Sequence, residues 1–287
     1  MQSLWGFARV IGAEATTGAG ARRIGGHVVD LCPCEPDDAR DAEALLDELA
    51  AYDVAVQSRD GKSVPSGTEV AYRQRARYVP RLAPPPQPLR RAEGKALRPE
   101  GSYVITGGLG GLGLQMLQRA TSDGWGGARR IILGTRSGAP SGESAQVVAD
   151  IVAKTGAQIE CVRSDVSVEK DVHELLRAAG TSKQPLLGVF HLAGLAGDGT
   201  IKQLTWDKFV SQTTAKIHGS YYLDAATCNS ALDHFVLFTS IYGLLGNPQL
   251  SHYAAANSYQ DGLAHSRRQE GQTAVALSWG TWAGAGM

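Results

Sequence analysis

Side chains in the C-terminal part of the chain have the types and spacing needed to act on a carbonyl group. Tyr253 follows Ser240 by thirteen residues and precedes Asn257 by four. This spacing suits a serine at the end of a strand and a tyrosine on a helix beside it. A ketone that accepts a hydride develops negative charge on its oxygen, which then needs a proton donor and hydrogen bonds. The pattern therefore indicates a carbonyl reductase.

Each of these residues has an expected role in that chemistry. Tyr253 is the proton donor, and Lys216 supplies the cation that would lower the phenol pKa toward the working pH. Ser240 would hold the carbonyl oxygen. Asn257, one helical turn after the tyrosine, could fix a water or a backbone group in a proton relay. Taken singly, each residue is equally consistent with an ordinary structural role, and only the combination points to catalysis.

A glycine-rich turn supplies the expected nucleotide site. It follows one predicted strand and opens the next predicted helix, where glycines let the backbone approach a pyrophosphate and helix N-terminal amides stabilise it. Its position in the first of several strand–helix units separates it from glycine turns that serve only packing. The predicted phosphate-binding residues are Thr106, Gly107, Leu109, Gly110, Gly111, Leu112 and Gly113.

The ends of the next strands indicate which nicotinamide cofactor binds. Arg136 and Ser137 end the second strand of this region. An acidic residue there would bind the ribose 2′-hydroxyl, whereas an arginine favours the 2′-phosphate of NADPH. Asp165 and Val166 follow the third strand and are placed to contact the adenine. Asp165 could equally cap the helix predicted to open at Ser167, and both interpretations stay open.

The fourth strand ends in small residues where the nicotinamide ribose would pass, namely Ala193 and Gly194. His191, just before them, is expected to be a packed strand-end histidine rather than a catalyst. Cys32 and Cys34 lack the spacing of a zinc site and have no matching second pair, so no metal is expected.

Strands and helices alternate regularly after residue 101. Near-continuous apolar strands separated by amphipathic helices are typical of a parallel sheet covered on both faces. The sequence therefore predicts an α/β fold with a Rossmann-type doubly wound parallel sheet. Strands are expected over 103–106, 130–135, 158–163, 187–191, 234–239 and 273–278. Helices are expected over 112–122, 143–155, 167–178, 206–228 and 253–270.

A smaller α/β segment, residues 1–82, precedes this region. It has no glycine-rich turn and no catalytic set, and it is predicted to be partial and non-catalytic. Its expected elements are helices over 4–11 and 37–49 and strands over 27–31, 53–57 and 69–73. Residues 83–100 contain a proline-dense stretch that cannot enter a sheet or a helix interior, so we expect a connector there. The catalytic part is then residues 101–287.

Composition excludes several other classes of protein. Lys plus Arg equals Asp plus Glu, 28 against 28, so no global field favours nucleic acid or an anionic membrane. No apolar run reaches the roughly 18 residues of a membrane helix. The four cysteines are few and scattered, which is typical of reduced thiols in a cytoplasmic protein.

Together these residues resemble the ketoreductase domain of modular type I polyketide synthases and related fatty acid synthases, within the short-chain dehydrogenase/reductase superfamily. The resemblance covers nearly the whole chain. It is specific because Lys216 precedes the Ser240 and Tyr253 pair, Asn257 stands where other members have lysine, and no Tyr-x-x-x-Lys occurs. The resemblance implies reduction of a β-ketoacyl chain tethered to an acyl carrier protein, with NADPH as cofactor and other synthase domains as neighbours.

The chain departs from the family's pattern at its ends and in one loop. It stops at Met287, where the family continues into a lid, so the catalytic part is expected to lack that lid. Members that form the D-alcohol typically carry Leu-Asp-Asp after the fourth strand, and here Asp198 alone remains. Members that form the L-alcohol carry a tryptophan where this chain has Leu245, and Pro248 also resembles the D-type. The resemblance therefore favours the D-alcohol.

Two other functions fit the same fold. A sugar-nucleotide epimerase or dehydratase would normally require the Tyr-x-x-x-Lys that is missing. A catalytically silent, KR-like scaffold domain of a synthase would normally have lost the tyrosine, the serine or the glycine turn, all of which this chain retains.

Overall fold

The computed structural model describes residues 10, 28–30, 42–48, 69–73, 76–81, 83–84, 95–195 and 197–282. By its internal contacts the chain divides into two compact units. One unit is Ile11–Ala92, and the other is Met1–Val10 together with Glu93–Met287. The larger unit contains every residue expected to take part in chemistry.

The smaller unit has a three-stranded sheet in its described part. Strand β1 (Val28–Asp30) pairs in parallel with β2 (Glu69–Arg73), and β2 pairs antiparallel with β3 (Ala76–Tyr78). A helical stretch spans residues 42–48 and buries Glu48, which accepts a hydrogen bond from the Tyr72 hydroxyl at 2.9 Å and pairs with the Arg77 guanidinium. Strand β3 was not expected from the sequence. Apart from residue 10, the helix expected over 4–11 and the strand expected over 53–57 lie outside the described residues.

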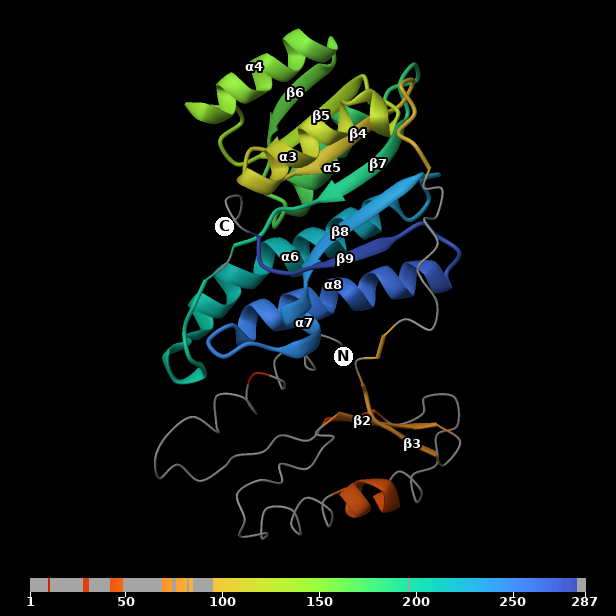
Figure 1. Ribbon diagram of the computed structural model, residues 1–287, viewed down its shortest axis with the longest axis vertical. Helices are drawn as coiled ribbons and strands as arrows, with labels where there is room; N and C mark the ends of the chain where they lie inside the picture. The colour runs from red at the N-terminus through yellow and green to blue at the C-terminus, as the bar shows by residue number, and fades with distance from the viewer. Residues whose placement is uncertain are drawn as a thin grey trace. The chain divides into compact units, whose positions relative to one another are not determined.

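The larger unit is built on a six-stranded, entirely parallel sheet (Figure 1) with the order β6-β5-β4-β7-β8-β9. The predicted fold class is confirmed. Every residue of β4 is buried, as is typical of a central parallel strand, and its middle is the apolar run Tyr103–Ile105. The strands are β4 (Ser102–Thr106), β5 (Arg130–Thr135), β6 (Gln158–Arg163), β7 (Leu186–His191), β8 (His234–Ser240) and β9 (Val275–Trp279).

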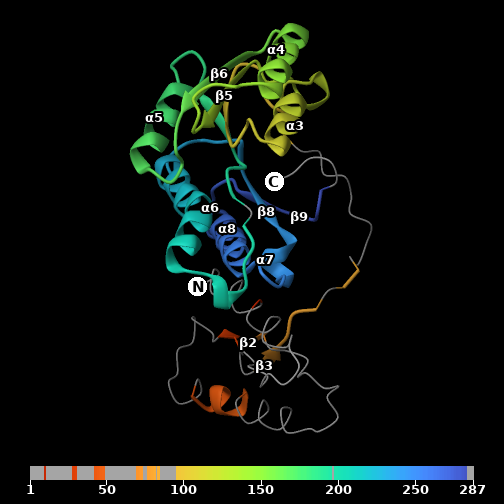
Figure 2. The same cartoon turned by 90° about the vertical axis from the view of Figure 1, so that its left-hand side faces the viewer.

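Helices cover both faces of this sheet (Figures 1 and 2). Successive residues of β4 point to opposite faces. Val104 packs in a core with α5, α6 and α8, whereas Tyr103 and Ile105 pack in a second core with α3 and α4. The helices are α3 (Gly111–Ala120), α4 (Glu143–Thr155), α5 (Glu169–Ala179), α6 (Trp206–Thr227), α7 (Ile241–Leu245) and α8 (Ser251–Gln269), with 3₁₀ turns η1 (Asp123–Trp125) and η2 (Ile201–Gln203).

The order of the strands places a switch point at the carboxyl ends of the central strands. The chain proceeds outward from β4 to β5 and β6, and then returns to the other side of β4 to form β7, β8 and β9. Connections on the two sides of β4 therefore run in opposite directions, and ligands bind at such a switch point, outside the carboxyl ends of the strands.

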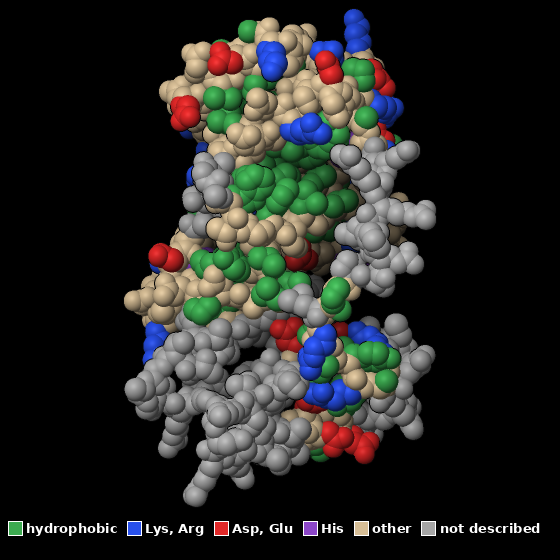
Figure 3. All heavy atoms as spheres, in the orientation of Figure 1, with side chains coloured by type: hydrophobic (Ala, Val, Ile, Leu, Met, Phe, Trp, Pro, Cys, Tyr) green, Lys and Arg blue, Asp and Glu red, His purple; other side chains and the backbone are tan. Residues whose placement is uncertain are grey.

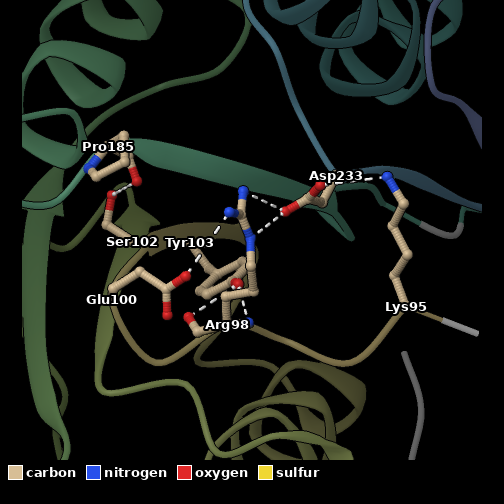
Figure 4. A network of polar contacts seen from close by, with 7 residues as sticks. All are labelled: Lys95, Arg98, Glu100, Ser102, Tyr103, Pro185 and Asp233. Carbon is tan, nitrogen blue, oxygen red and sulfur yellow. Dashed lines mark hydrogen bonds and ion pairs between the residues drawn. The ribbon is translucent and has the colours of Figure 1, made fainter.

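The opposite edge of the sheet is fixed by a polar network (Figure 4) around the start of β4. Arg98 Nη2 lies 2.7 Å from Asp233 Oδ2, and Lys95 Nζ lies 3.3 Å from Asp233 Oδ1. The Arg98 amide donates to the Tyr103 hydroxyl at 2.6 Å. Burial would raise the pKa of Asp233, but the hydrogen bonds and charges of Arg98 and Lys95 lower it overall. The segment that enters the sheet is thereby held to the loop before β8.

Three local features differ from the sequence predictions. Helix α7 was not expected, and it follows β8 directly because the Ser240 hydroxyl caps it by accepting from the Tyr242 amide at 3.3 Å. Helix α5 begins at Glu169 rather than at residue 167, and β9 begins at Val275 rather than at residue 273. Within the described residues no helix is long and apolar enough to cross a membrane, and no group of His, Cys, Asp or Glu is arranged to hold a metal ion.

Candidate active site

Three of the four predicted catalytic side chains meet in one cavity of about 470 Å³ at the carboxyl edge of the sheet, and the fourth, Asn257, is not part of its lining. Ser240 reaches the cavity from the end of β8, Lys216 from the middle of α6, and Tyr253 from the first turn of α8. The glycine turn between β4 and α3 forms another wall of the same cavity. Lys216 and Tyr253, which are 37 positions apart in the sequence, are thus brought to the same cavity.

Tyr253 lies partly buried in a position suited to a proton donor. Burial raises the pKa of its phenol above the ordinary value, and hydrogen-bonding interactions with Ser240 and Asn257 lower it to a smaller degree. The phenol is therefore protonated at neutral pH, which is the form that an acid catalyst needs. Ser240 is 6% exposed and is held at the end of its strand by its bond to the Tyr242 amide.

Lys216 is buried behind the tyrosine and is 3% exposed. Its Nζ donates to the Phe238 carbonyl oxygen at 2.7 Å and to Gln260 Oε1 at 3.0 Å, and it lies 5.8 Å from the centroid of the Tyr253 ring. Burial lowers the pKa of the ammonium group to about 7, while the Asp261 carboxylate raises it less. The sequence predicts that this cation lowers the pKa of the phenol. The structure shows instead that burial dominates both groups.

Asn257 is fully buried one turn after the tyrosine. Its Nδ2 donates to the Tyr253 carbonyl oxygen at 2.7 Å, so the asparagine fixes the first turn of α8 as well as facing the phenol. Its Oδ1 is a buried acceptor without a hydrogen-bond partner among the described groups. Buried polar groups are nearly always paired, so an acceptor without a partner at this position is unusual.

The glycine turn is packed so closely that a side chain would not fit at its centre. Gly107 has a φ of 70°, a left-handed conformation that favours glycine. A Cβ atom on Gly113 would lie 2.3 Å from the Gly107 carbonyl oxygen and 2.6 Å from Gly108 Cα. Helix α3 therefore starts directly against the turn, with its N-terminal amides available to an anion.

A second cavity, of about 440 Å³, contains the residues predicted to bind the adenosine end of the cofactor. Arg136 and Ser137 line it from the end of β5, and Asp165 and Val166 line it from the segment after β6. The two cavities share part of their lining, so they form one groove along the edge of the sheet. The shared residues are Gly107, Gly110, Ala193 and Gly194.

Asp165 has a local structural role in this groove. Its Oδ1 accepts from the Ser167 amide at 2.9 Å and from the Ser167 hydroxyl at 2.6 Å. These bonds lower the pKa of the carboxyl group, and the nearby charge of Arg136 lowers it further. The residue before α5 is Val168, so Asp165 stabilises the turn ahead of the helix rather than capping the helix itself.

His191 is buried between β4 and α6. Its Nδ1 lies 2.7 Å from Thr106 Oγ1 and its Nε2 lies 3.1 Å from the Ala215 carbonyl oxygen. Burial and the charge of Lys216 lower the pKa of the imidazole to about 3, so it stays neutral. It joins the ends of two strands to a helix, as expected of a packed strand-end histidine.

The residues expected to control stereochemistry lie outside both cavities. Asp198, Leu245 and Pro248 are exposed on the loop after β7 and around the α7–α8 connection. These two segments are tied together, because the Gly199 amide donates to the Gln249 carbonyl oxygen at 3.1 Å. His252 Nε2 also lies 2.7 Å from the Gly197 carbonyl oxygen.

The sequence analysis did not predict two residues at this site, Tyr242 and Gln260. Tyr242 lines the catalytic cavity from α7, a helix that was not predicted. Gln260 contacts Lys216 from α8. Its position seven residues after Tyr253 places both on one face of a helix, and that spacing was the available signal.

Comparison with known proteins places the chain in a family. The KR domain family matches residues 101–284, and the chain belongs to this family of ketoreductase domains. Its members are oxidoreductases of the short-chain dehydrogenase/reductase type that bind a nicotinamide cofactor and reduce β-keto groups in polyketide synthases.

Curated relatives of this chain are much longer than the chain itself. A phthioceranic/hydroxyphthioceranic acid synthase of Mycobacterium tuberculosis is 34% identical over 68% of this chain, which spans 9% of that protein. One component of the phenolphthiocerol/phthiocerol polyketide synthase of the same species is 32% identical over 99% of this chain, which spans 15% of that protein.

Solved structures show the same architecture. An A1-type ketoreductase is 32% identical with a TM-score of 0.84, and the match covers 100% of this chain and 55% of that chain. A ketoreductase from the first module of phoslactomycin biosynthesis in Streptomyces is 32% identical with a TM-score of 0.80, over 99% of this chain and 60% of that chain.

The packing of the glycine turn predicts unequal effects of alanine at two of its positions. Gly113→Ala should destabilise the protein by about 1–3 kcal/mol, because the new methyl group meets backbone atoms that cannot move aside. Gly110→Ala is the matched control, since its Cβ would lie 3.5 Å from the Gly107 carbonyl oxygen, an ordinary contact. Denaturant unfolding of both variants measures the difference, and equal stabilities would contradict the packing described.

Proposed function

We propose that this chain catalyses the NADPH-dependent reduction of a β-ketoacyl thioester, carried on an acyl carrier protein, to the β-hydroxyacyl thioester. One observation carries the proposal: Tyr253, Ser240 and Lys216 line a single cavity that is continuous with the glycine turn. The activity is then that of a 3-oxoacyl-[acyl-carrier-protein] reductase within polyketide or fatty acid biosynthesis. Neighbouring synthase domains would be its partners, as the length of the relatives suggests, and its location would be the cytoplasm.

The residues present fit a dinucleotide. The turn around Gly107 and Gly113 leaves backbone, not side chains, against the groove, which is what a pyrophosphate requires. Arg136 lines the far end of the same groove, where its guanidinium would bind a 2′-phosphate. Ala193 and Gly194, in the shared part, would lie beside the nicotinamide ribose. We therefore assign NADPH rather than NADH.

The mechanism follows from the protonation states of the chain's own residues. NADPH, when bound, supplies the hydride. Tyr253, protonated at neutral pH, donates its proton to the carbonyl oxygen as negative charge develops there. Ser240 binds the same oxygen and orients it against the phenol. Lys216, held behind the phenol, stabilises the negative charge that the proton transfer leaves on the tyrosine.

Asn257 completes the arrangement in this proposal. Its Nδ2 holds the backbone of the tyrosine, and its Oδ1 is left to accept a hydrogen bond at the site. We assign this acceptor to a relay that returns a proton to the phenol after each reduction. The relay would thus depend on a residue whose position is fixed by the first turn of α8.

Tyr253→Phe should lower the rate of reduction roughly 10²–10⁴-fold, because the ring still packs but the acid is lost. Binding of NADPH should change by no more than a few-fold. Turnover of a simple β-ketoacyl thioester, followed by NADPH absorbance, measures the effect. Tyr242→Phe is the matched control, since that tyrosine lines the same cavity. Reduction by Tyr253→Phe at the parent rate would refute the catalytic assignment, and no turnover by the parent would favour a silent scaffold.

Arg136→Ala should weaken NADPH binding about ten- to hundred-fold and leave NADH nearly unaffected, because only NADPH carries the 2′-phosphate. Fluorescence titration of both cofactors against parent and variant measures the two affinities. Arg129→Ala is the control, since it removes the same charge beside the other end of β5. Equal losses for the two cofactors would show that Arg136 is structural.

The reduction product should be the D-alcohol, because Asp198 is present and position 245 is not tryptophan. The catalytic atoms and the face from which the hydride arrives are fixed. The direction from which the substrate approaches therefore determines the configuration of the alcohol. Leu245→Trp should increase the share of L-alcohol, whereas Leu244→Trp, at the neighbouring exposed position, should not. Chiral chromatography of the products distinguishes these results, and a predominantly L-configured product from the parent would overturn the assignment.

A further inference from the structure

A polar contact between α6 and α8 links the catalytic lysine to a residue that no catalytic role explains. Gln260 is fully buried, and its Oε1 accepts from Lys216 Nζ at 3.0 Å. Helices α6 and α8 pack against each other around this side chain. The Gln260 amide therefore faces neither solvent nor the catalytic cavity, whose lining does not include it. A buried amide costs free energy unless it is paired, so its partners explain its presence.

The orientation of the Gln260 amide is determined by its second contact. Its Nε2 donates to the Ser220 hydroxyl at 2.8 Å, and that hydroxyl in turn donates to the Lys216 carbonyl oxygen. Ser220 is also fully buried and lies one turn after the lysine. With the amide nitrogen committed to Ser220, the amide oxygen must face the ammonium group. The chain of bonds therefore starts and ends on the same lysine.

These contacts leave Lys216 with a defined geometry. An ammonium group has three donors. Two are used by the Phe238 carbonyl oxygen and by Gln260, which lie on different elements of the fold. The third donor is not used by either of these contacts, and Lys216 lines the catalytic cavity together with Tyr253. Removal of either acceptor would leave the group free to rotate and would weaken its charged form.

We propose that Gln260 is a positioning residue for the reduction, which holds the Lys216 ammonium group charged and directed at the catalytic cavity. The inference rests on the proposed function for its effect on turnover. Gln260 does not touch the cavity itself, so its action passes through the lysine.

The charge of Lys216 should be visible in the pH dependence of reduction. Its pKa is about 7, so the ammonium group is present at lower pH and is lost as the pH rises through that value. The other titratable groups that face it are Asp261 on α8, His191 at the end of β7, and Tyr253. His191 stays neutral down to about pH 3 and the phenol pKa is raised, so neither accounts for a loss of activity near neutrality.

Two substitutions at position 260 should move this dependence in opposite directions. Gln260→Met keeps the size of the side chain but removes the acceptor, so the Lys216 pKa falls further. At neutral pH the reduction rate should drop about ten-fold, and acidic pH should restore much of it. Gln260→Glu places a carboxylate beside the ammonium group, so the Lys216 pKa rises and activity extends to higher pH.

The experiment combines pH profiles with a direct titration of the lysine. Reduction of a β-ketoacyl thioester is measured on both sides of neutrality for the parent, Gln260→Met and Gln260→Glu. The Lys216 pKa is measured separately by NMR of protein carrying ¹³C-lysine, with the signal assigned by Lys216→Met. Thr227→Val is the control, because it removes a buried hydroxyl from α6, the helix that carries Lys216, without contacting the lysine.

Opposite pKa shifts in the two variants, with an unshifted Thr227→Val, are the expected result. An unchanged Lys216 pKa in both variants, or the same shift in all three, would show that Gln260 only packs the interface. If the parent itself does not reduce the thioester, the proposed function fails. The NMR titration still decides whether Gln260 controls the lysine, because it requires no turnover.

Discussion

The ammonium group of Lys216 is held in the interior by two acceptors that reach it from separate parts of the fold. Desolvation of a charge costs several kcal/mol even after relaxation. The Phe238 carbonyl oxygen from β8 and the Gln260 amide from α8 accept two of its hydrogen bonds. Burial lowers the pKa of the group to about 7, and the Asp261 carboxylate raises it to a smaller degree. The packing of α6 against α8 and against the sheet therefore determines both where the charge lies and whether it exists at neutral pH.

The parallel arrangement of the strands explains why the site lies at the carboxyl edge of the sheet. Ser240, Lys216 and Tyr253 come from three different elements, and a parallel sheet brings the carboxyl ends of all its strands to one edge. Ser240 ends β8, the glycine turn follows β4, and α8 begins close by with Tyr253. The polar network around Asp233 fixes the opposite edge (Figure 4), so the strands keep their register where the site needs it.

Sequence patterns were sufficient for the sheet, for the helices that cover it and for three side chains that line one cavity, Lys216, Ser240 and Tyr253. Continuous apolar runs specify buried parallel strands, and the observed β5 and β6 match the predicted bounds. Helix α7 was missed because its residues continue the apolar run of β8, and only the Ser240 cap separates the two. Hydrophobic side chains also gather on the surface of the larger unit (Figure 3), which no periodicity revealed. One of them is Val275 of β9, which is 45% exposed.

The protonation states could not be predicted from the sequence, because they depend on burial and on partners that are distant in the chain. The contact between Gln260 and Lys216 joins residues 44 positions apart, and nothing in either local segment indicates it. Asp165 differs, because its partner Ser167 is only two residues away, and what the sequence left open was where α5 begins.

The raised pKa of Tyr253 also bears on reversibility. Oxidation of an alcohol would need the phenolate as a base, and a phenol with a pKa above its ordinary value of 10.0 has less than about one molecule in a thousand in that form at neutral pH. The resting protein therefore holds the proton that reduction consumes and lacks the base that the reverse reaction requires. Under the proposed function, reoxidation of an alcohol at neutral pH would therefore require the phenol to lose its proton first.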